Sequence, residues 1–189
     1  MKKLLIVGSG GHGRCCLDIA RDLNRYDEIS FLDDGHMNEV INDCNVIGTM
    51  SDMKKYFSHD VDIFVAIGNN QLRKQLFLEA KHIGYTIATL ISPYAYVSSY
   101  SCIEEGTVVF PHVTIESNVH IGKGCIITSN ATVNHDVNID NYCLVYSQSV
   151  VRPNTLIKEL SRIGSGCVIG FGTILEKESD IKDGEDVNV

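Results

Sequence analysis

The sequence of 189 residues has no tryptophan, only three prolines and no apolar run near the 20 or so residues that cross a bilayer. With 44% hydrophobic and 21% charged residues, it is expected to fold around a core and to be neither disordered nor membrane-spanning. Basic residues are also scarce, since 16 Lys and Arg face 24 Asp and Glu, a formal charge of −8. Nucleic acids and anionic membranes are held mainly by Lys and Arg, so neither is an expected partner.

The sequence also lacks the cysteine pattern of a disulfide scaffold or a zinc site. Its seven cysteines are an odd number and contain no C-x-x-C pair, so we expect no metal. Only four apolar residues, Leu4–Val7, follow the basic start Lys2-Lys3, which is too short for the core of a signal peptide. These features favour a reducing, cytoplasmic location.

Residues 1–90 alternate short apolar runs with helical patterns. Asn69 or Asn70 can cap a helix that starts after the third run. Strand, helix and strand in this order predict an α/β domain with a small parallel sheet, similar to a Rossmann domain. The predicted strands are Leu4–Val7, Ile29–Leu32 and Ile63–Ile67.

Residues 91–189 follow a period of six. Every sixth residue from Ile91 to Val187 is Ile, Val or Leu, and the residue four places after each is small up to Ser179, failing only at Glu185. Such a unit is one short strand plus a turn, and three units make an 18-residue coil that stacks on the next with the aliphatic side chain inside. The sequence therefore predicts a second domain, a parallel β-helix, in which three cysteines are small packing residues: Cys125, Cys143 and Cys167.

The hexads, most clearly Ile121-Gly-Lys-Gly-Cys-Ile and Ile163-Gly-Ser-Gly-Cys-Val, resemble the hexapeptide-repeat acyltransferases. That family has a left-handed parallel β-helix. Three motifs in the first half narrow the resemblance to the sugar acyltransferases of the bacillosamine and sialic acid pathways. The resemblance implies a homotrimer, acetyl-CoA as donor, and a nucleotide-linked or free sugar as acceptor. The three motifs are Leu5-Ile-Val-Gly-Ser-Gly-Gly-His-Gly13, Phe31-Leu-Asp-Asp34, and Ala66-Ile-Gly-Asn-Asn70 with Arg73-Lys74.

The motif Gly8-x-Gly10-x-x-Gly13 follows a predicted strand and opens a helix, where glycines let a phosphate approach the backbone and the helix N-terminus. Alone, it is also the fingerprint of a nicotinamide-dependent enzyme. Only about 90 residues precede the repeats, and His12 lies inside the loop, which disfavours that alternative. A turn that needs glycine for packing alone is the other interpretation. The resemblance implies a nucleotide-sugar pocket made by Gly8, Gly10, Gly11, His12, Gly13, Asp33, Asp34, Gly68, Asn69 and Asn70.

The second candidate centre is Val133-Asn-His-Asp-Val137. His135 stands two places after a buried aliphatic, so its side chain is expected to point outward, where a histidine can act as a base in acyl transfer. Adjacent residues on a flat strand point to opposite sides, so contact with Asp136 requires a corner here. The resemblance implies that His135 is the general base and that Asp136 orients it. The other histidines outside the glycine loop show no partner in the sequence: His36, His59, His82, His112 and His120.

The chain departs from the family in two places. Eighteen residues beyond His135, relatives have a glycine whose amide steadies the thioester oxygen, whereas this chain has Pro153, which lacks an N–H. The nearest substitute amide is that of Asn154, which we assign to the acetyl-CoA site. The Gly-x-Pro-Ala-Lys segment of relatives is also absent, and an acidic run that we expect to be a solvated face takes its place: Glu176, Glu178, Asp180, Asp183, Glu185 and Asp186.

The sequence thus favours an acetyl-CoA-dependent acyltransferase acting on an amino or hydroxyl group of a sugar. Pro153 and the altered C-terminal stretch favour an alternative, a nucleotide-sugar-binding subunit or sensor without efficient transfer.

Overall fold

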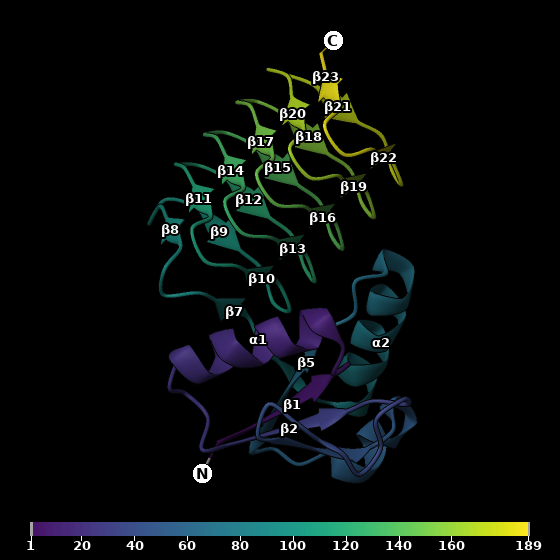
Figure 1. Cartoon of the computed structure of the whole chain (residues 1–189). Helices are drawn as coiled ribbons and strands as arrows, with labels where there is room; N and C mark the ends of the chain where they lie inside the picture. Colours follow the sequence, from purple (N-terminus) through teal and green to yellow (C-terminus); the bar gives the residue numbers. More distant parts are fainter. Residues whose placement is uncertain (1, 189) are drawn as a thin grey trace. The chain divides into compact units, whose positions relative to one another are not determined.

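The computed structural model describes residues 2–188, and the chain divides into two compact units, Met1–Leu90 and Ile91–Val189. Figure 1 shows the two architectures, a mixed sheet with helices in the first unit and a stack of short strands in the second. No helix within residues 2–188 is long and apolar enough to span a membrane.

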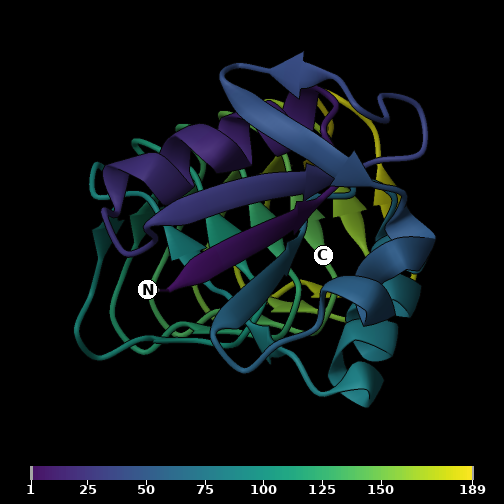
Figure 2. The ribbon, with the colours of Figure 1, turned by 90° about the horizontal axis from the view of Figure 1, so that it is seen from below.

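The first unit is built on a six-stranded sheet in the order β3-β4-β2-β1-β5-β6, in which only the β3–β4 pair is antiparallel. Figure 2 shows β1 between β2 and β5. Helices α1 (Gly11–Asp22) and α2 (Asn70–Ile83) follow β1 and β5, and a 3-10 helix, η1 (Met50–Tyr56), follows β4. The strands are β1 (Lys3–Val7), β2 (Glu28–Leu32), β3 (Val40–Ile41), β4 (Cys44–Gly48), β5 (Val61–Val65) and β6 (Thr86–Ile87).

This unit differs from the sequence prediction in its third strand, in the β3–β4 hairpin, and in η1 and β6, which were not predicted. The third predicted strand, Ile63–Ile67, instead runs Val61–Val65, because the chain leaves the sheet there to form the loop before α2. The β3–β4 hairpin was missed. Its two-residue turn places Asn42 and Asp43 at φ of 47° and 56°, a conformation that asparagine and aspartate tolerate best after glycine.

The second unit is a β-helix of three parallel sheets, as the period of six predicted. Each strand pairs with the strand 18 residues further on, for example Val109 with Ile127 and Ile127 with Val145. The aliphatic row from Val109 to Ile169 is buried in the interior, and Ile181 is partly exposed where the stack ends.

The strands of the three sheets have two residues each. The first sheet holds β7 (Leu90–Ile91), β10 (Val108–Val109), β13 (Ile126–Ile127), β16 (Leu144–Val145), β19 (Arg162–Ile163) and β22 (Asp180–Ile181). The second holds β8 (Tyr96–Val97), β11 (Thr114–Ile115), β14 (Thr132–Val133), β17 (Val150–Val151), β20 (Val168–Ile169) and β23 (Asp186–Val187). The third holds β9 (Cys102–Ile103), β12 (His120–Ile121), β15 (Asn138–Ile139), β18 (Leu156–Ile157) and β21 (Ile174–Leu175).

The corners between these strands share one backbone conformation. Every sixth residue from Gly106 to Gly184 has φ between 58° and 75°, and most of these residues are not glycine. A left-handed residue is costly for an L-amino acid. Most of these corners are held by a hydrogen bond from the corner N–H to a carbonyl of the preceding coil, as from Asp136 to Ser117 at 3.1 Å and from Gly172 to Pro153 at 3.0 Å.

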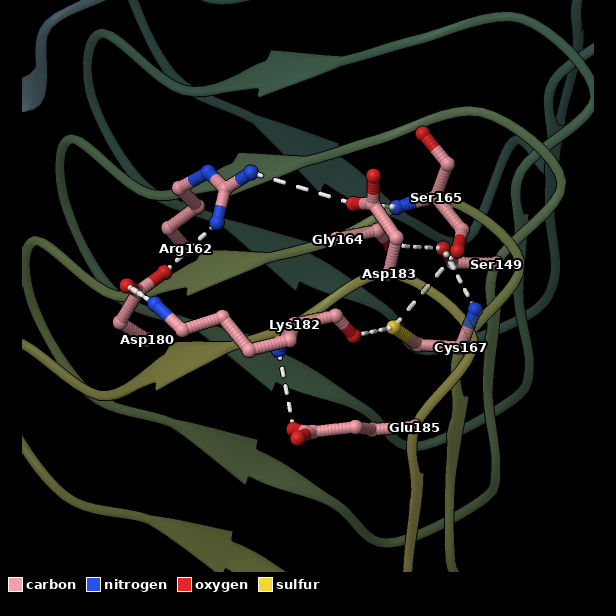
Figure 3. Close-up of polar contacts among 9 residues, drawn as sticks. All are labelled: Ser149, Arg162, Gly164, Ser165, Cys167, Asp180, Lys182, Asp183 and Glu185. Carbon is pink, nitrogen blue, oxygen red and sulfur yellow. Dashed lines mark hydrogen bonds and ion pairs between the residues drawn. The ribbon is translucent and has the colours of Figure 1, made fainter.

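The row of small residues joins the coils through hydroxyl and thiol groups. Thr107 Oγ1 donates to the carbonyl of Gly122 at 2.7 Å and accepts from the amide of Cys125 at 2.9 Å. Ser149 makes the same two bonds, to Gly164 and from Cys167, as Figure 3 shows. The thiols of three cysteines also donate to carbonyls of the next coil, which gives them the structural role expected: Cys125, Cys143 and Cys167.

The acidic run near the C-terminus belongs to the last coils and is more than a solvated face. Asp180 pairs with Arg162 at 2.7 Å, and Asp183 accepts from the amide of Ser165 at 2.9 Å. These contacts, drawn in Figure 3, tie the last coil to the one before it.

We predict that Thr107→Val lowers the free energy of unfolding by about 1–3 kcal/mol, because it leaves a buried carbonyl and a buried amide without a partner. Valine fits this row, as at Val113 and Val119, so the loss measures the hydrogen bonds and not a clash. Urea unfolding followed by circular dichroism tests this. The outward-facing Thr132→Val is the control and should change the free energy by less than about 0.5 kcal/mol. Equal effects of both variants would contradict the role given to the row.

Candidate active site

One candidate site lies at the carboxyl edge of the sheet in the first unit. Val7 is in register with Leu32 and Val65, so the loops that follow β1, β2 and β5 leave the same edge. β1 connects through α1 to β2 on one side, while β5 lies on its other side. This reversal of strand order is where ligands of open α/β sheets bind.

Two glycines of the loop after β1 are required by packing. Gly8 has φ of 99°, and a Cβ there would lie 2.9 Å from the carbonyl oxygen of Ala66. A Cβ on Gly13 would lie 2.0 Å from the carbonyl oxygen of Gly8, so α1 can approach the loop only if residue 13 is glycine. The packing interpretation therefore accounts for this pair.

Packing within the chain does not explain Gly10, Gly11 or Gly68. A Cβ on Gly10 or Gly68 would meet nothing within 4 Å, and one on Gly11 would meet only the Arg14 side chain, at 4.0 Å. Gly10 is the N-cap of α1 and provides no side-chain cap, and the first turn has no acidic residue. A backbone that is open on one side at a helix N-terminus suits a phosphate group.

Asp33, the residue that follows β2, orders the loops at this edge. Its carboxylate accepts hydrogen bonds from the amides of Ser9 at 2.7 Å and Gly35 at 2.8 Å. Burial raises the pKa of Asp33, but these hydrogen bonds outweigh it, so the pKa lies below its usual value. The carboxylate is therefore ionised and already occupied by the protein backbone.

Asp34 and His36, the polar residues that follow Asp33, make different contacts from it. Asp34 is exposed and accepts a hydrogen bond through Oδ1 from the amide of Met50 at 2.9 Å, so it is the more available carboxylate. His36, for which the sequence analysis found no partner, places Nδ1 3.1 Å from Ser9 Oγ and 3.3 Å from Asp33 Oδ1. The only sequence feature that could have indicated the contact with Asp33 is the spacing of three residues between Asp33 and His36.

The loop after β5 is held by a buried arginine. Asn69 caps α2 with its side chain, as predicted, whereas Asn70 accepts a hydrogen bond from Arg73 at 2.6 Å. The Arg73 side chain is 1% exposed and also donates to the carbonyls of Ile67 at 2.8 Å and Gly68 at 3.0 Å. Arg73 stands in the sequence motif, but its role in fixing the Gly68–Asn70 loop was not predicted.

His12 lies in the first turn of α1, with its ring nitrogen Nε2 3.7 Å from Cys16 Sγ. Burial, and then the positive charge of Arg73, lower the pKa of His12 to about 4. The imidazole is therefore neutral at pH 7 and acts as a hydrogen-bonding group without charge.

A separate candidate site, in the second unit, is the corner between β14 and β15. Asp136 is the left-handed residue of this corner, with φ of 59°, so its carboxylate turns back toward the preceding residue. His135 Nδ1 lies 2.7 Å from Asp136 Oδ2, and about half of each side chain is exposed. The corner thus makes the contact that a flat strand would prevent.

The preceding coil supports this pair. Glu116 accepts from the amide of His135 at 2.9 Å, and the Asn118 side chain donates to Asp136 Oδ1 at 3.2 Å. The hydrogen bonds from His135 and then Asn118 lower the pKa of Asp136. An ionised carboxylate at Nδ1 favours the tautomer with the proton there, which leaves Nε2 able to accept one.

The coil after His135 presents Arg152, Pro153 and Asn154 at the same corner. Asn154 has φ of 59° like the other corners, but among residues 2–188 its amide has no hydrogen-bond partner, as is also true of Asn118 and Asn130. The unpaired amide therefore stands next to the proline that replaces the family's glycine.

His120, also thought to lack a partner, has ring nitrogens 2.9 Å from both Glu104 and Asn138. Within the described part of the chain, no three His, Cys, Asp or Glu residues are placed to hold a metal ion.

Comparison with known proteins identifies the family. Residues 3–80 match the model of the PglD N-terminal domain. The acetyltransferase domain of PglB from Neisseria gonorrhoeae FA1090 is 33% identical, with a TM-score of 0.96 over 100% of this chain and 92% of its own. The chain belongs to the PglD-like sugar N-acetyltransferases. This confirms the bacillosamine-type resemblance and the β-helical acyltransferase fold.

Two further relatives, and the PglB domain in a second structure, have known substrates or ligands. UDP-N-acetylbacillosamine N-acetyltransferase of Bacillus subtilis (strain 168) is 33% identical over 124 residues, which cover 57% of this chain and about half (51%) of that protein. PerB from Caulobacter crescentus, solved with CoA and GDP-perosamine, is 25% identical, with a TM-score of 0.81 over 97% of this chain and 92% of its own. The PglB domain is also known in complex with acetyl coenzyme A, with a TM-score of 0.91 over 98% of this chain and 95% of its own at 33% identity.

We predict that two glycine substitutions in the loop after β1 affect different properties, one the stability and the other the ligand affinity. Gly13→Ala should destabilise the first unit by several kcal/mol, because its Cβ overlaps the Gly8 carbonyl. Gly10→Ala should leave the melting temperature unchanged but weaken nucleotide-sugar binding, because its methyl group enters the space proposed for phosphate. Thermal unfolding and calorimetry measure the two effects. Unchanged nucleotide-sugar affinity in Gly10→Ala would place the ligand elsewhere.

Proposed function

We propose that this protein transfers the acetyl group of acetyl-CoA to an amino group of a nucleotide-linked sugar, with His135 as the general base. The observation that carries the proposal is the His135–Asp136 pair on an exposed corner, with Nε2 left to accept a proton. The N-acetyltransferase relatives favour an amino over a hydroxyl acceptor.

In this mechanism the sugar amine attacks the thioester carbonyl while His135 Nε2 takes a proton from the amine nitrogen. The new C–N bond forms, the C–S bond breaks, and the leaving thiolate of CoA takes the proton from the imidazolium. Asp136 holds the ring and stabilises its positive charge, and a base so placed contributes about 10²–10⁴-fold to the rate.

The acceptor is bound by the first unit. The open backbone at Gly10 and Gly11 and the N-terminus of α1 bind the diphosphate, and neutral His12 offers a hydrogen bond beside it. Asp34 is the carboxylate available to the nucleoside. The other predicted residues shape this edge: Gly8, Gly13, Asp33, Gly68, Asn69 and Asn70.

The donor is bound at the corner after His135. The unpaired amide of Asn154 stabilises the thioester oxygen, in place of the glycine amide that Pro153 removes. In a single copy of the chain, about half of the His135 and Asp136 side chains is exposed. This exposure supports a homotrimer in which a neighbouring copy covers the pair. All seven cysteines lie within residues 2–188 and are free thiols, and the proposed site of action is the cytoplasm.

One observation favours a second function. If Pro153 leaves the thioester oxygen without a donor, the protein binds nucleotide sugars as a subunit or sensor and transfers acetyl groups slowly or not at all. That function predicts nucleotide-sugar binding by calorimetry with no acetyl-CoA binding at millimolar concentration.

We predict that His135→Asn lowers kcat by about 10²–10⁴-fold and leaves nucleotide-sugar affinity unchanged, because only the proton acceptor is lost. Thiol release from acetyl-CoA, with UDP-4-amino sugars and GDP-perosamine as acceptors, measures kcat. His120→Asn, a paired histidine of the same unit, is the control and should keep wild-type kcat. Activity of His135→Asn within a few-fold of wild type would remove the mechanism.

The role of Asn154 leads to a prediction for Pro153→Gly. Since the Asn154 amide already stabilises the thioester oxygen, restoring a glycine amide should change kcat by less than about threefold. An oxyanion donor is worth about 10²–10³-fold in kcat. A rise of that size in Pro153→Gly would show that the wild type lacks a donor and would support the second function.

A further inference from the structure

The basic residues of the second unit differ in whether they have a carboxylate partner. Residues 91–189 hold six Lys and Arg against twelve Asp and Glu. Five of the six have a carboxylate oxygen within 4.0 Å, and Figure 3 shows two of them, Arg162 and Lys182, around Asp180. The five are Lys123, Lys158, Arg162, Lys177 and Lys182.

The sixth, Arg152, is the exception. Its side chain is exposed and, within residues 2–188, forms no ion pair and no hydrogen bond. In a unit with twice as many acidic as basic residues, an arginine without a carboxylate partner is left to bind an anion from outside the chain.

The position of Arg152 connects this cation with the candidate site. β14 and β17 are paired so that Val133 faces Val151. Arg152 therefore stacks one coil beyond Asn134, the residue before His135, and precedes Pro153 and Asn154. The unpaired guanidinium and the unpaired Asn154 amide occupy the same corner.

We propose that Arg152 binds a phosphate group of a substrate held at the His135 corner. This rests on the proposed function, in which both substrates carry a diphosphate. A guanidinium presents a fork of N–H donors that matches two phosphate oxygens, and no carboxylate competes for it here. The phosphate belongs to the coenzyme or to the nucleotide sugar, and the two arms of the experiment separate these sources.

The test is Arg152→Ala, with KM and kcat measured for each substrate in turn. Loss of a charge-assisted contact should raise the KM of one substrate by about tenfold or more while kcat stays within about threefold. In the first arm, acetyl-CoA is compared with S-acetyl-pantetheine, which lacks the diphosphate. In the second, the nucleotide-linked amino sugar is compared with the free amino sugar. The penalty should disappear with the phosphate-free form of the substrate that Arg152 binds.

Arg162→Ala is the matched control, because it removes the same charge from a cation that is paired with Asp180. It should leave both KM values at the wild-type level. Thermal unfolding checks that both variants keep the fold, since Arg152 is exposed whereas Arg162 is partly buried and paired with Asp180. Calorimetric titration with CoA, and with GDP-perosamine and UDP-4-amino sugars, gives the same comparison as dissociation constants.

Several outcomes would overturn the assignment. They are unchanged KM values in Arg152→Ala, a KM increase that persists with the phosphate-free substrate, or a fall in kcat at constant KM, which would place Arg152 on the transition state. In each of these cases the wild-type enzyme is active, so the proposed function stands. A wild-type protein that neither binds CoA nor transfers acetyl groups would instead refute the proposed function, and the role of Arg152 with it.

Discussion

Parallel pairing between residues 18 apart is the interaction on which the second unit depends. The backbone amides and carbonyls of each coil form hydrogen bonds with the coils before and after it. The hydroxyl or thiol groups of the small-residue row add hydrogen bonds to carbonyls of the next coil. Successive coils are about 4.8 Å apart in this direction. Residues that share a corner are thus stacked in a column. The His135–Asp136 pair, the residues that support it and the proposed donor site occupy adjacent levels of this column: 134–136, 116–118 and 152–154, respectively.

The left-handed corner brings the two proposed catalytic side chains, His135 and Asp136, into contact. Histidine followed by aspartate is a short-range pattern, and on a regular strand their side chains would diverge. At φ of 59° Asp136 instead meets His135, and the amide of Asp136 is held by Ser117 of the coil before. The strain of one corner is therefore offset by a bond that exists only because the coils are in register.

Periodicity made much of the fold predictable. Because one insertion would shift every later aliphatic off the interior, an unbroken row from Ile91 to Val187 determined both the coil length and the register. The need for a corner at His135 followed from the same reasoning. The conformation of the corner did not, since Tyr142 and Leu160 adopt it as readily as Asn118 or Gly124. The left hand of the β-helix and the trimer stay predictions from the family resemblance.

The contacts that could not be predicted are those between residues far apart in the chain. The sequence indicated a glycine loop but not that Gly13 faces the Gly8 carbonyl while Gly10 faces open space. Nor did it indicate that Asp33 accepts a hydrogen bond from the amide of Ser9, or that the buried Arg73 donates to the carbonyl of Gly68. Such contacts depend on how strand ends meet at the edge of the sheet, which local pattern does not encode.

The most direct test of the central claim is a crystal structure of the protein with CoA and a nucleotide-linked amino sugar. The account predicts that the sugar amine and the CoA sulfur both lie at the His135 corner, with the amine about 3–3.5 Å from Nε2 and the coenzyme beside Pro153 and Asn154. A coenzyme bound away from this column, or a His135 ring turned from Asp136 and the sugar, would contradict it.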